Sequence, residues 1–178
     1  MLLKIVIGVV IVLVVFLVVV LMQPSDFRVV RSKKMKGSPA VAFSQVNDFR
    51  KWEGWSPWEK LDLKMKKVYE GPEAGKGATY SWNGDNNVGE GKLTILESKP
   101  DEQVDLKLEF KRPFTCTNDA SFTFKKEGDE TLVTWEMTGK NRFVAKMMGL
   151  FINMDKMVGS QFEDGLNAMG NIVESESK

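Results

Sequence analysis

Apolar residues follow three different patterns along this chain, and the first is an unbroken run. It contains 18 residues, from Ile5 to Met22, with Lys4 before it and Gln23 after it. A helix of that length covers roughly 27 Å, close to the ~30 Å hydrocarbon core of a bilayer. A cleaved signal peptide is the alternative, but its apolar region is shorter and ends in a small-residue cleavage site, which is missing here. The run therefore predicts a retained transmembrane helix, with residues 1–25 as membrane anchor and short linker.

The second pattern is an alternation of apolar and polar residues with period two. It lies within a predicted domain over residues 26–173, which is followed by a frayed tail over 174–178. Residues 26–36 are predicted to form a strand that starts apolar and turns basic. Ser38 and Pro39 suit the start of a short helix, because serine caps free N–H groups and proline fits the first helical position. From Leu61 onward the apolar period changes to two, and turns rich in Gly, Asn and Asp separate the apolar stretches.

This alternation predicts about seven strands in all, joined by short turns. The clearest case is residues 103–111, whose apolar positions are Val104, Leu106, Leu108 and Phe110. Charged residues occupy the positions between them, so one face of the strand is wet. The expected arrangement is an antiparallel sheet with one apolar face that needs a cover.

The third pattern is a helical stripe near the C-terminus, which supplies that cover. It runs from Phe143 to Val173 and is interrupted by glycines. Each glycine weakens a helix by roughly 1 kcal/mol relative to alanine, so a break into two helices is expected near Gly159. The predicted fold class is α+β, a curved sheet against a long C-terminal helix.

Several segments carry a resemblance to a known superfamily. They read "NDFRKWEGWSPW", "YEGPEAGKGATYSWNG", "VGEGKLTI", "TLVTWEMTGK" and "MVGSQFEDGL". With this order of elements, the chain resembles the helix-grip superfamily (SRPBCC) that groups START lipid-transfer domains, polyketide cyclases and the birch pollen allergen. The likeness is greatest to the polyketide cyclase/dehydrase and lipid-transport branch, and it extends from about Arg31 to Met169. It implies a curved sheet that grips the C-terminal helix around an apolar cavity; the transmembrane helix lies outside that pattern.

Apolar residues on the facing sides of sheet and helix are the predicted cavity lining. They are Tyr80, Trp82, Leu106, Leu108, Phe110, Phe122, Phe124, Val133, Trp135, Met137, Met147, Phe151, Met154, Phe162, Leu166 and Met169. Five of the ten methionines lie between Met147 and Met169, and methionine adapts to varied apolar shapes. The helical glycines leave gaps as well. A solid core is the alternative, since the pattern itself predicts it equally.

Three tryptophans, Trp52, Trp55 and Trp58, lie within seven residues. Pro57 rules out one continuous helix, so a short helix running into a turn is expected. We interpret the rings as a plug or lid over one end of the sheet–helix core, because tryptophan combines a large apolar body with one N–H. Carbohydrate stacking and a bilayer-interface belt are the alternatives. The charged neighbours expected in water are Arg50, Lys51, Glu53 and Glu59.

A basic run follows the predicted anchor and is a candidate membrane-surface contact. It consists of Arg28, Arg31, Lys33, Lys34 and Lys36. The alternative is the outer face of the first strand. The five basic residues after the anchor outnumber the single basic residue before it, which favours a cytoplasmic domain.

The amino-acid composition argues against several classes of function. Lysine and arginine number 25 against 24 acidic residues, which argues against a general nucleic-acid binder. The single cysteine, Cys116, excludes an internal disulfide, and the absence of histidine excludes Ser-His-Asp triads and imidazole metal ligands. We expect no metal and no cofactor.

The candidate catalytic carboxylates mostly alternate with apolar residues and are expected in solvent. They are Asp48, Glu53, Asp62, Glu97, Glu109, Glu136, Asp155, Glu163 and Asp164. General acid–base work at neutral pH needs burial that the sequence does not reveal, so no residue is assigned a catalytic role. The predicted function is binding or carriage of a hydrophobic small molecule or lipid by a membrane-tethered domain. A cyclase/aromatase-type enzyme and a ligand-free scaffold are the alternatives, and the oligomeric state stays open.

Overall fold

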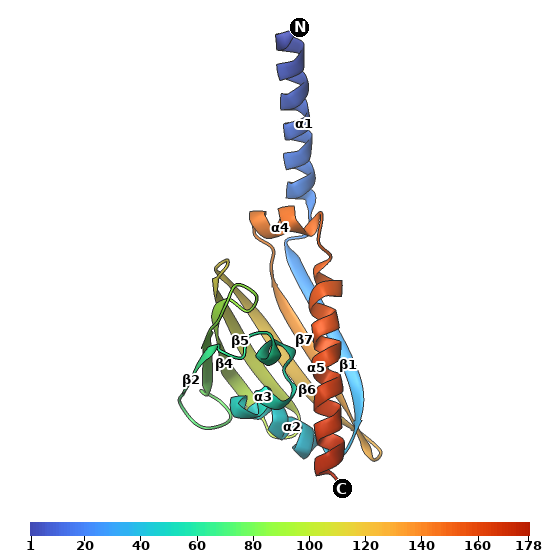
Figure 1. Ribbon diagram of the computed structural model, residues 1–178. Helices are drawn as coiled ribbons and strands as arrows, with labels where there is room; N and C mark the ends of the chain where they lie inside the picture. The colour runs from blue at the N-terminus through green and yellow to red at the C-terminus, as the bar shows by residue number, and fades with distance from the viewer.

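Seven antiparallel strands form one strongly curved sheet, as Figure 1 shows. The computed structural model covers residues 1–178. In spatial order the strands are β1, β7, β6, β5, β4, β3 and β2. Their bounds are β1 Asp26–Lys36, β2 Lys66–Glu70, β3 Thr79–Asn83, β4 Glu90–Lys99, β5 Gln103–Arg112, β6 Cys116–Glu127 and β7 Glu130–Lys140. The predicted α+β class, with about seven strands and a long C-terminal helix, is confirmed.

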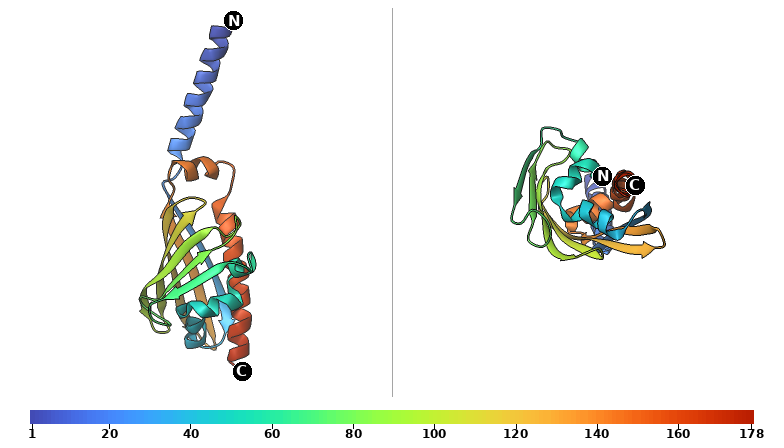
Figure 2. Two further views of the ribbon diagram at one scale, coloured as in Figure 1. Left: turned by 60° about the vertical axis from the view of Figure 1, so that its left-hand side comes forward. Right: turned by 90° about the horizontal axis from the view of Figure 1, so that it is seen from below.

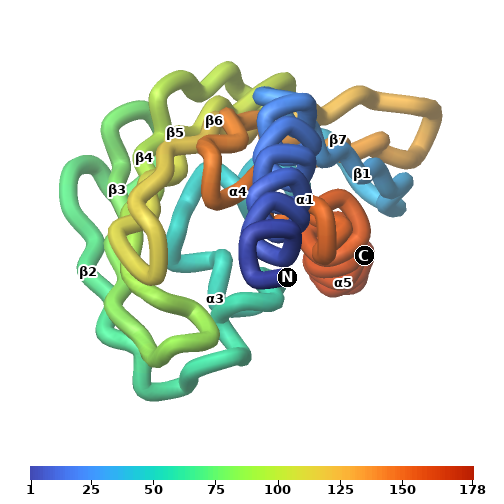
Figure 3. Tube along the Cα trace, turned by 90° about the horizontal axis from the view of Figure 1, so that it is seen from above, coloured from blue at the N-terminus to red at the C-terminus, as the bar shows by residue number.

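Helix α1 lies outside the curved sheet, and three other α-helices lie on its hollow side. The α-helices are α1 Leu2–Met22, α2 Pro39–Asn47, α3 Trp52–Trp55, α4 Phe143–Gly149 and α5 Met154–Glu176, and the 3₁₀ turns are η1 Phe49–Lys51 and η2 Pro57–Lys60. Figure 1 shows that α1 projects from one end of the domain, here named the α1 end, while the chain finishes at the far end. Helices α2, α3 and α5 occupy the hollow side of the sheet (Figures 2 and 3).

The first and last strands along the chain, β1 and β7, pair with each other. Val29 of β1 lies opposite Met137 of β7, and this antiparallel ladder extends over the whole length of both strands. The other neighbours are consecutive hairpins. In β4, Leu96 is an extra residue between the pairs that Ile95 and Glu97 make with β5. Such a bulge increases the local twist and helps the sheet to curve.

Helix α5 buries one apolar stripe inside the curve. Phe162, Leu166, Met169 and Val173 are each at most 1% exposed. They recur every three or four residues, so they share one face of the helix. The main contacts of α5 are with β1, α3, α2 and η2. The helix therefore lies over one edge of the sheet, and α2 and α3 fill the remaining hollow.

The break in the C-terminal helical pattern is not at the predicted place. It falls between α4 and α5, where Asn153 caps α5 by accepting a hydrogen bond from the Lys156 N–H at 2.9 Å, whereas Gly159 lies inside α5. The end of α5 also differs from the expected frayed tail, because the helix continues to Glu176. There the Gln45 amide donates to the Glu176 carboxylate at 2.9 Å and holds the last turn.

Candidate ligand-binding site

Two tryptophans of the cluster lie in the centre of the core. Trp52 and Trp55 are 4% and 1% exposed. Their indole N–H groups donate to the carbonyl oxygens of Val46 at 2.9 Å and Gln45 at 3.0 Å. These carbonyls belong to the last turn of α2, where they have no partner within the helix. The structure thus places both rings deeper than a plug at one end, and only Trp58 is partly exposed.

The rings pack directly on several predicted lining residues. Trp135 stacks on Phe162 with centroids 3.9 Å apart and on Phe122 at 4.7 Å. Trp55 meets the edges of this stack, at 5.6 Å from Trp135 and 6.0 Å from Phe122. These three lining residues therefore contact one another and the tryptophans in the middle of the core. These rings fill the middle of the hollow side, so a ligand would have to bind on another part of it.

The glycines of α5 do not leave the gaps that their sequence positions suggested. A Cβ at Gly165 would lie 3.1 Å from the Trp135 ring and 3.2 Å from Cδ of Pro57, and one at Gly170 would lie 3.1 Å from the Lys33 stem. At Gly159 it would collide with the guanidinium of Arg31. Glycine at these positions permits close approach of helix and sheet. The prediction that these glycines leave gaps for a cavity is therefore wrong.

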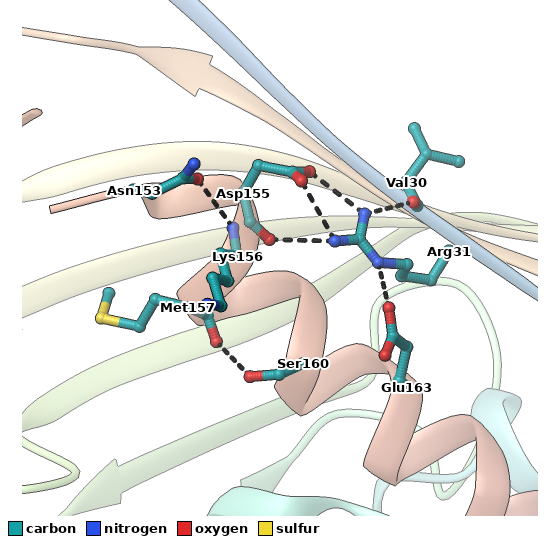
Figure 4. Close-up of polar contacts among 8 residues, drawn as sticks. All are labelled: Val30, Arg31, Asn153, Asp155, Lys156, Met157, Ser160 and Glu163. Atoms are coloured by element: carbon teal, nitrogen blue, oxygen red, sulfur yellow. Dashed lines mark hydrogen bonds and ion pairs between the residues drawn. The ribbon is translucent and has the colours of Figure 1, made fainter.

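Arg31 ties the first turns of α5 to the sheet (Figure 4). Its Nε donates to Glu163 at 2.6 Å, and Nη1 and Nη2 each donate to the Asp155 carboxylate at 3.1 Å. The Nη1 group also reaches the carbonyl of Val30 at 2.8 Å. Hydrogen bonding to Arg31 lowers the pKa of Asp155. Arg31 is thus committed to contacts within the domain.

The other residues of the predicted membrane-surface group are also dispersed. Arg28 pairs with Glu136 at 2.7 Å and Lys34 pairs with Glu127 at 2.9 Å. Because β1 rises about 3.3 Å per residue, Lys36 lies roughly 33 Å from Asp26, toward the far end. Lys33 and Lys34 lie on that side as well, so Arg28 is the member of the group placed near the α1 end. The geometry does not favour a shared membrane contact for the five residues.

Three predicted lining residues from the C-terminal segment lie outside the core. Met147 belongs to α4, Phe151 to the link and Met154 to the first turn of α5. Phe151 is 80% exposed, and the two methionines are partly exposed. They lie at the α1 end because the chain turns away from the sheet before α5 begins.

A buried carboxylate is the polar feature that the sequence reasoning missed. Glu59 was expected in water but is 7% exposed. The Tyr80 hydroxyl donates to its Oε1 at 2.5 Å, and the Lys67 ammonium forms an ion pair with Oε2. Burial raises the pKa of Tyr80 well above its ordinary value, and the bond to Glu59 raises it further. The Tyr80 hydroxyl proton is engaged by Glu59, so it is not free to donate to a ligand. The sequence feature that could have indicated burial of Glu59 is its position directly after Pro57 and Trp58.

An apolar face remains on the inner side of the sheet near α1. We define the α1-end face as Leu108, Phe110, Asn118, Ala120 and Met137. The register joins them, since Leu108 lies opposite Asn118 and Ala120 lies opposite Met137. Leu108 and Phe110 are half-buried, whereas the residues deeper on the same strand are at most 1% exposed. Short side chains at Ala120 and Asn118 lie between the larger apolar ones.

Two polar groups lie on or beside this face. Asn118 is part of the face, and Cys116 lies two residues before it, opposite Phe110 at the start of β6. Burial raises the pKa of Cys116, so the thiol is neutral at physiological pH. The α1-end face is therefore mainly apolar, with a neutral amide and a neutral thiol near its edge. Such a surface suits an apolar ligand with a small polar group.

A pocket of about 390 Å³ adjoins the α1 end and contains two predicted lining residues, Phe151 and Met154. It lies between the end of α1, α4 and the start of α5, and its other lining residues include Gln23, Pro24, Lys146 and Gly149. A second pocket of about 330 Å³ lies at the far end around Ser38, Lys126 and Asp129, and it is mostly polar.

Several solved structures share this arrangement of sheet and helix. A protein of unknown function from Staphylococcus aureus superposes with a TM-score of 0.63 at 13% identity, covering 88% of this chain and 98% of its own. The Aha1 dimer from Colwellia psychrerythraea gives 0.60 at 12% identity, with coverages of 83% and 96%. The ginseng major latex-like protein 151 from Panax ginseng gives 0.56 at 15% identity, with coverages of 87% and 99%.

The protein has the helix-grip fold. The resemblance noted in the sequence is thereby confirmed at the level of the fold. Identities of 12% to 15% carry no more than the fold. No protein-family model matches the sequence, and no curated protein matches it. In this helix-grip domain the α1-end face and the adjoining pocket are the candidate ligand-binding surfaces.

Proposed function

We propose that this helix-grip protein is a membrane-anchored domain that binds a hydrophobic small molecule or lipid. Helix α1 supports the anchor. It has 21 residues, which corresponds to about 31 Å of helix, and Val20 is its one buried residue. A helix so apolar and so exposed needs a hydrocarbon surrounding, and its length suits the ~30 Å bilayer core. In this proposal residues 1–25 are the anchor and the rest of the chain is the binding domain.

The half-buried state of Leu108 and Phe110 is the observation that carries the binding proposal. Both belong to the inner face of a helix-grip sheet. Phe110 meets one ring, that of Trp82 at 5.6 Å, and keeps part of its surface exposed, whereas the deeper Phe122 is fully covered by Trp52 and Trp55. A ligand lying on the α1-end face would remove apolar area from water at roughly 25 cal/mol per Å². Met137, at the β7 side of this face, can adapt to different ligand shapes.

An enzyme of the cyclase type finds less support. The buried acid Glu59 and the phenol of Tyr80 are hydrogen-bonded to each other, and Lys67 neutralises the pair. A general acid or base must instead reach a substrate proton at about 2.6–3.2 Å. The arrangement favours a structural role for this cluster, and we propose binding without chemistry.

A photoactivatable fatty acid tests the binding site. The full-length chain in lipid nanodiscs is cross-linked by a diazirine-bearing fatty acid, with and without excess unlabelled fatty acid, and the modified peptides are identified by mass spectrometry. We expect competable labelling of β5 and β6 peptides that carry Leu108, Phe110 and Ala120. Labelling of α1 serves as the internal measure of lipid contact.

Two matched variants locate the site. Ala120→Phe places a ring on the α1-end face, and Thr123→Phe places the same ring on the opposite face of the same strand, where Thr123 is exposed. Displacing about 60 Å² of ligand contact corresponds to ~1.5 kcal/mol, or about tenfold in affinity. We expect that loss for Ala120→Phe and none for Thr123→Phe. Labelling confined to α1 in the unmodified chain would sink the binding proposal and leave the ligand-free scaffold.

We also propose that the domain faces the cytoplasm. Lys4, in the first turn of α1, precedes the apolar run, whereas Arg28, Arg142 and Lys146 lie at the α1 end of the domain. Basic residues next to a membrane span are enriched on the cytoplasmic side. Protease added to intact cells should leave the domain uncut, and cutting before the cells are permeabilised would reverse the orientation.

A further inference from the structure

An apolar surface is exposed at the α1 end, next to the proposed anchor. Five of the ten residues between 143 and 152 are large apolar side chains with 38% to 80% of their surface exposed: Phe143, Val144, Met148, Phe151 and Ile152. Single exposed apolar side chains are ordinary on soluble proteins, but a contiguous group marks a contact surface. Helix α4 and residues 150–152 therefore form a surface that lacks a partner within the chain.

The placement of this segment identifies the partner. Figures 1 and 2 show α4 lying crosswise at the lower end of α1. The Lys146 ammonium donates to the carbonyl of Leu21 at 3.4 Å, and the Asn141 side chain donates to that of Pro24 at 3.3 Å. Since α1 is about as long as the hydrocarbon core is thick, its last turn lies at the bilayer surface. Helix α4 is held at that same depth.

The charges around the segment suit a membrane surface. Lys140, Arg142 and Lys146 are basic, and no acidic residue occurs between Glu136 and Asp155. Apolar side chains combined with basic ones are typical of elements that lie in the interface, where the rings enter the acyl boundary and the cations meet anionic headgroups. The partner that matches both features is a bilayer leaflet that contains anionic lipid.

We propose that α4 and residues 150–152 are a second membrane contact, embedded in the headgroup region beside α1. This inference rests on the proposed function in one respect, that α1 spans the bilayer. The pocket lined by Pro24, Lys146, Phe151 and Met154 then opens at the leaflet surface. A ligand reaches the domain from the leaflet at this point, without crossing bulk water.

Depth measurements on the full-length chain test the contact. Cys116 is replaced by serine, and a single new cysteine carries an environment-sensitive fluorophore in vesicles of phosphatidylcholine and phosphatidylglycerol. Gly149→Cys labels α4, because a Cβ at Gly149 meets no atom within 4 Å. Val12→Cys labels the middle of α1, where Val12 is 66% exposed. Lys125→Cys labels β6 toward the far end, with a side chain that is 76% exposed.

Quenchers attached at different lipid depths then separate the outcomes. We expect the Val12 label to respond to a deep acyl-chain quencher, the Gly149 label to a headgroup-level quencher and the Lys125 label to neither. Quenching at Val12 with none at Gly149 would overturn this inference while the anchor stands. A Val12 label that stays in water would overturn the anchor, and this inference with it.

Substitution of one exposed ring provides the second test. In the Gly149-labelled chain, Phe151→Asp should abolish the headgroup-level quenching, because a charge cannot enter the acyl boundary without cost. Leu63→Asp is the control, since Leu63 is 90% exposed and lies outside this segment. Circular dichroism confirms that both variants fold. Equal quenching in Phe151→Asp and the unmodified chain would refute insertion of this segment.

Discussion

Replacement of Trp55 by alanine is the perturbation that most directly tests the aromatic core. The ring is 1% exposed and lies 4.7 Å from Trp52, 5.6 Å from Trp135 and 6.0 Å from Phe122. Large-to-small changes of buried aromatic residues cost about 3–5 kcal/mol. The Gln45 carbonyl would also lose its indole donor at 3.0 Å, which adds about 1 kcal/mol if water does not replace it. We expect Trp55→Ala to lower the free energy of unfolding by about 4–6 kcal/mol.

Trp58→Ala provides the comparison for this prediction. Trp58 touches the same stack, at 5.7 Å from Trp135 and 6.2 Å from Phe162, but its ring is partly exposed. Its cost should be smaller than that of Trp55→Ala, because less apolar area leaves water when Trp58 folds into place.

Denaturant unfolding of the full-length chain in detergent micelles, followed by far-ultraviolet circular dichroism, measures both variants. Trp55→Phe keeps most of the ring volume but loses the N–H, so it separates the hydrogen bond from the packing. A loss below about 0.5 kcal/mol for Trp55→Ala, the usual range of surface changes, would show that the ring is not in the core. An equal loss in Trp55→Ala and Trp58→Ala would likewise refute the placement argued here.

Two further predictions concern packing and pH. Gly165→Ala should destabilise the protein relative to Gly149→Ala by about 1–3 kcal/mol, because both are helical glycines but only the first overpacks, against Trp135 and Pro57; equal denaturation midpoints would contradict this. Above about pH 10 the folded protein keeps the Tyr80 proton that the unfolded chain releases, since burial and the bond to Glu59 raise the pKa of Tyr80, so the free energy of unfolding falls as the pH rises. Tyr80→Phe should flatten that fall between pH 9 and 11, and an unchanged slope would show that the phenol is not held protonated.

Elements whose signal is local could be predicted from the sequence. The run Ile5–Met22 is apolar on every side, so the helix and its exposure follow without knowledge of any partner. Alternation around Leu106 identified β5 and its buried face, and the stripe from Phe162 to Val173 identified α5 as the helix on that face. Short-range periodicity determines which side of an element is apolar, and these assignments need no more than that.

Long-range contacts decided the rest, because periodicity says which face is buried but not what lies opposite. The pairing of β1 with β7 brings Arg31 against Gly159, which turned a predicted membrane-surface residue into a link between strand and helix. Local sequence does not distinguish Glu59 from its exposed charged neighbours; its burial depends on the fold, which places Tyr80 and Lys67 beside it. Trp52 and Trp55 lie deep because the free carbonyls of α2 accept their N–H groups at the centre of the core. The link of four residues between α4 and α5 ends at the Asn153 cap, and α5 then packs back over β1. No local pattern records this tertiary geometry, which places the exposed Phe151 beside the end of α1.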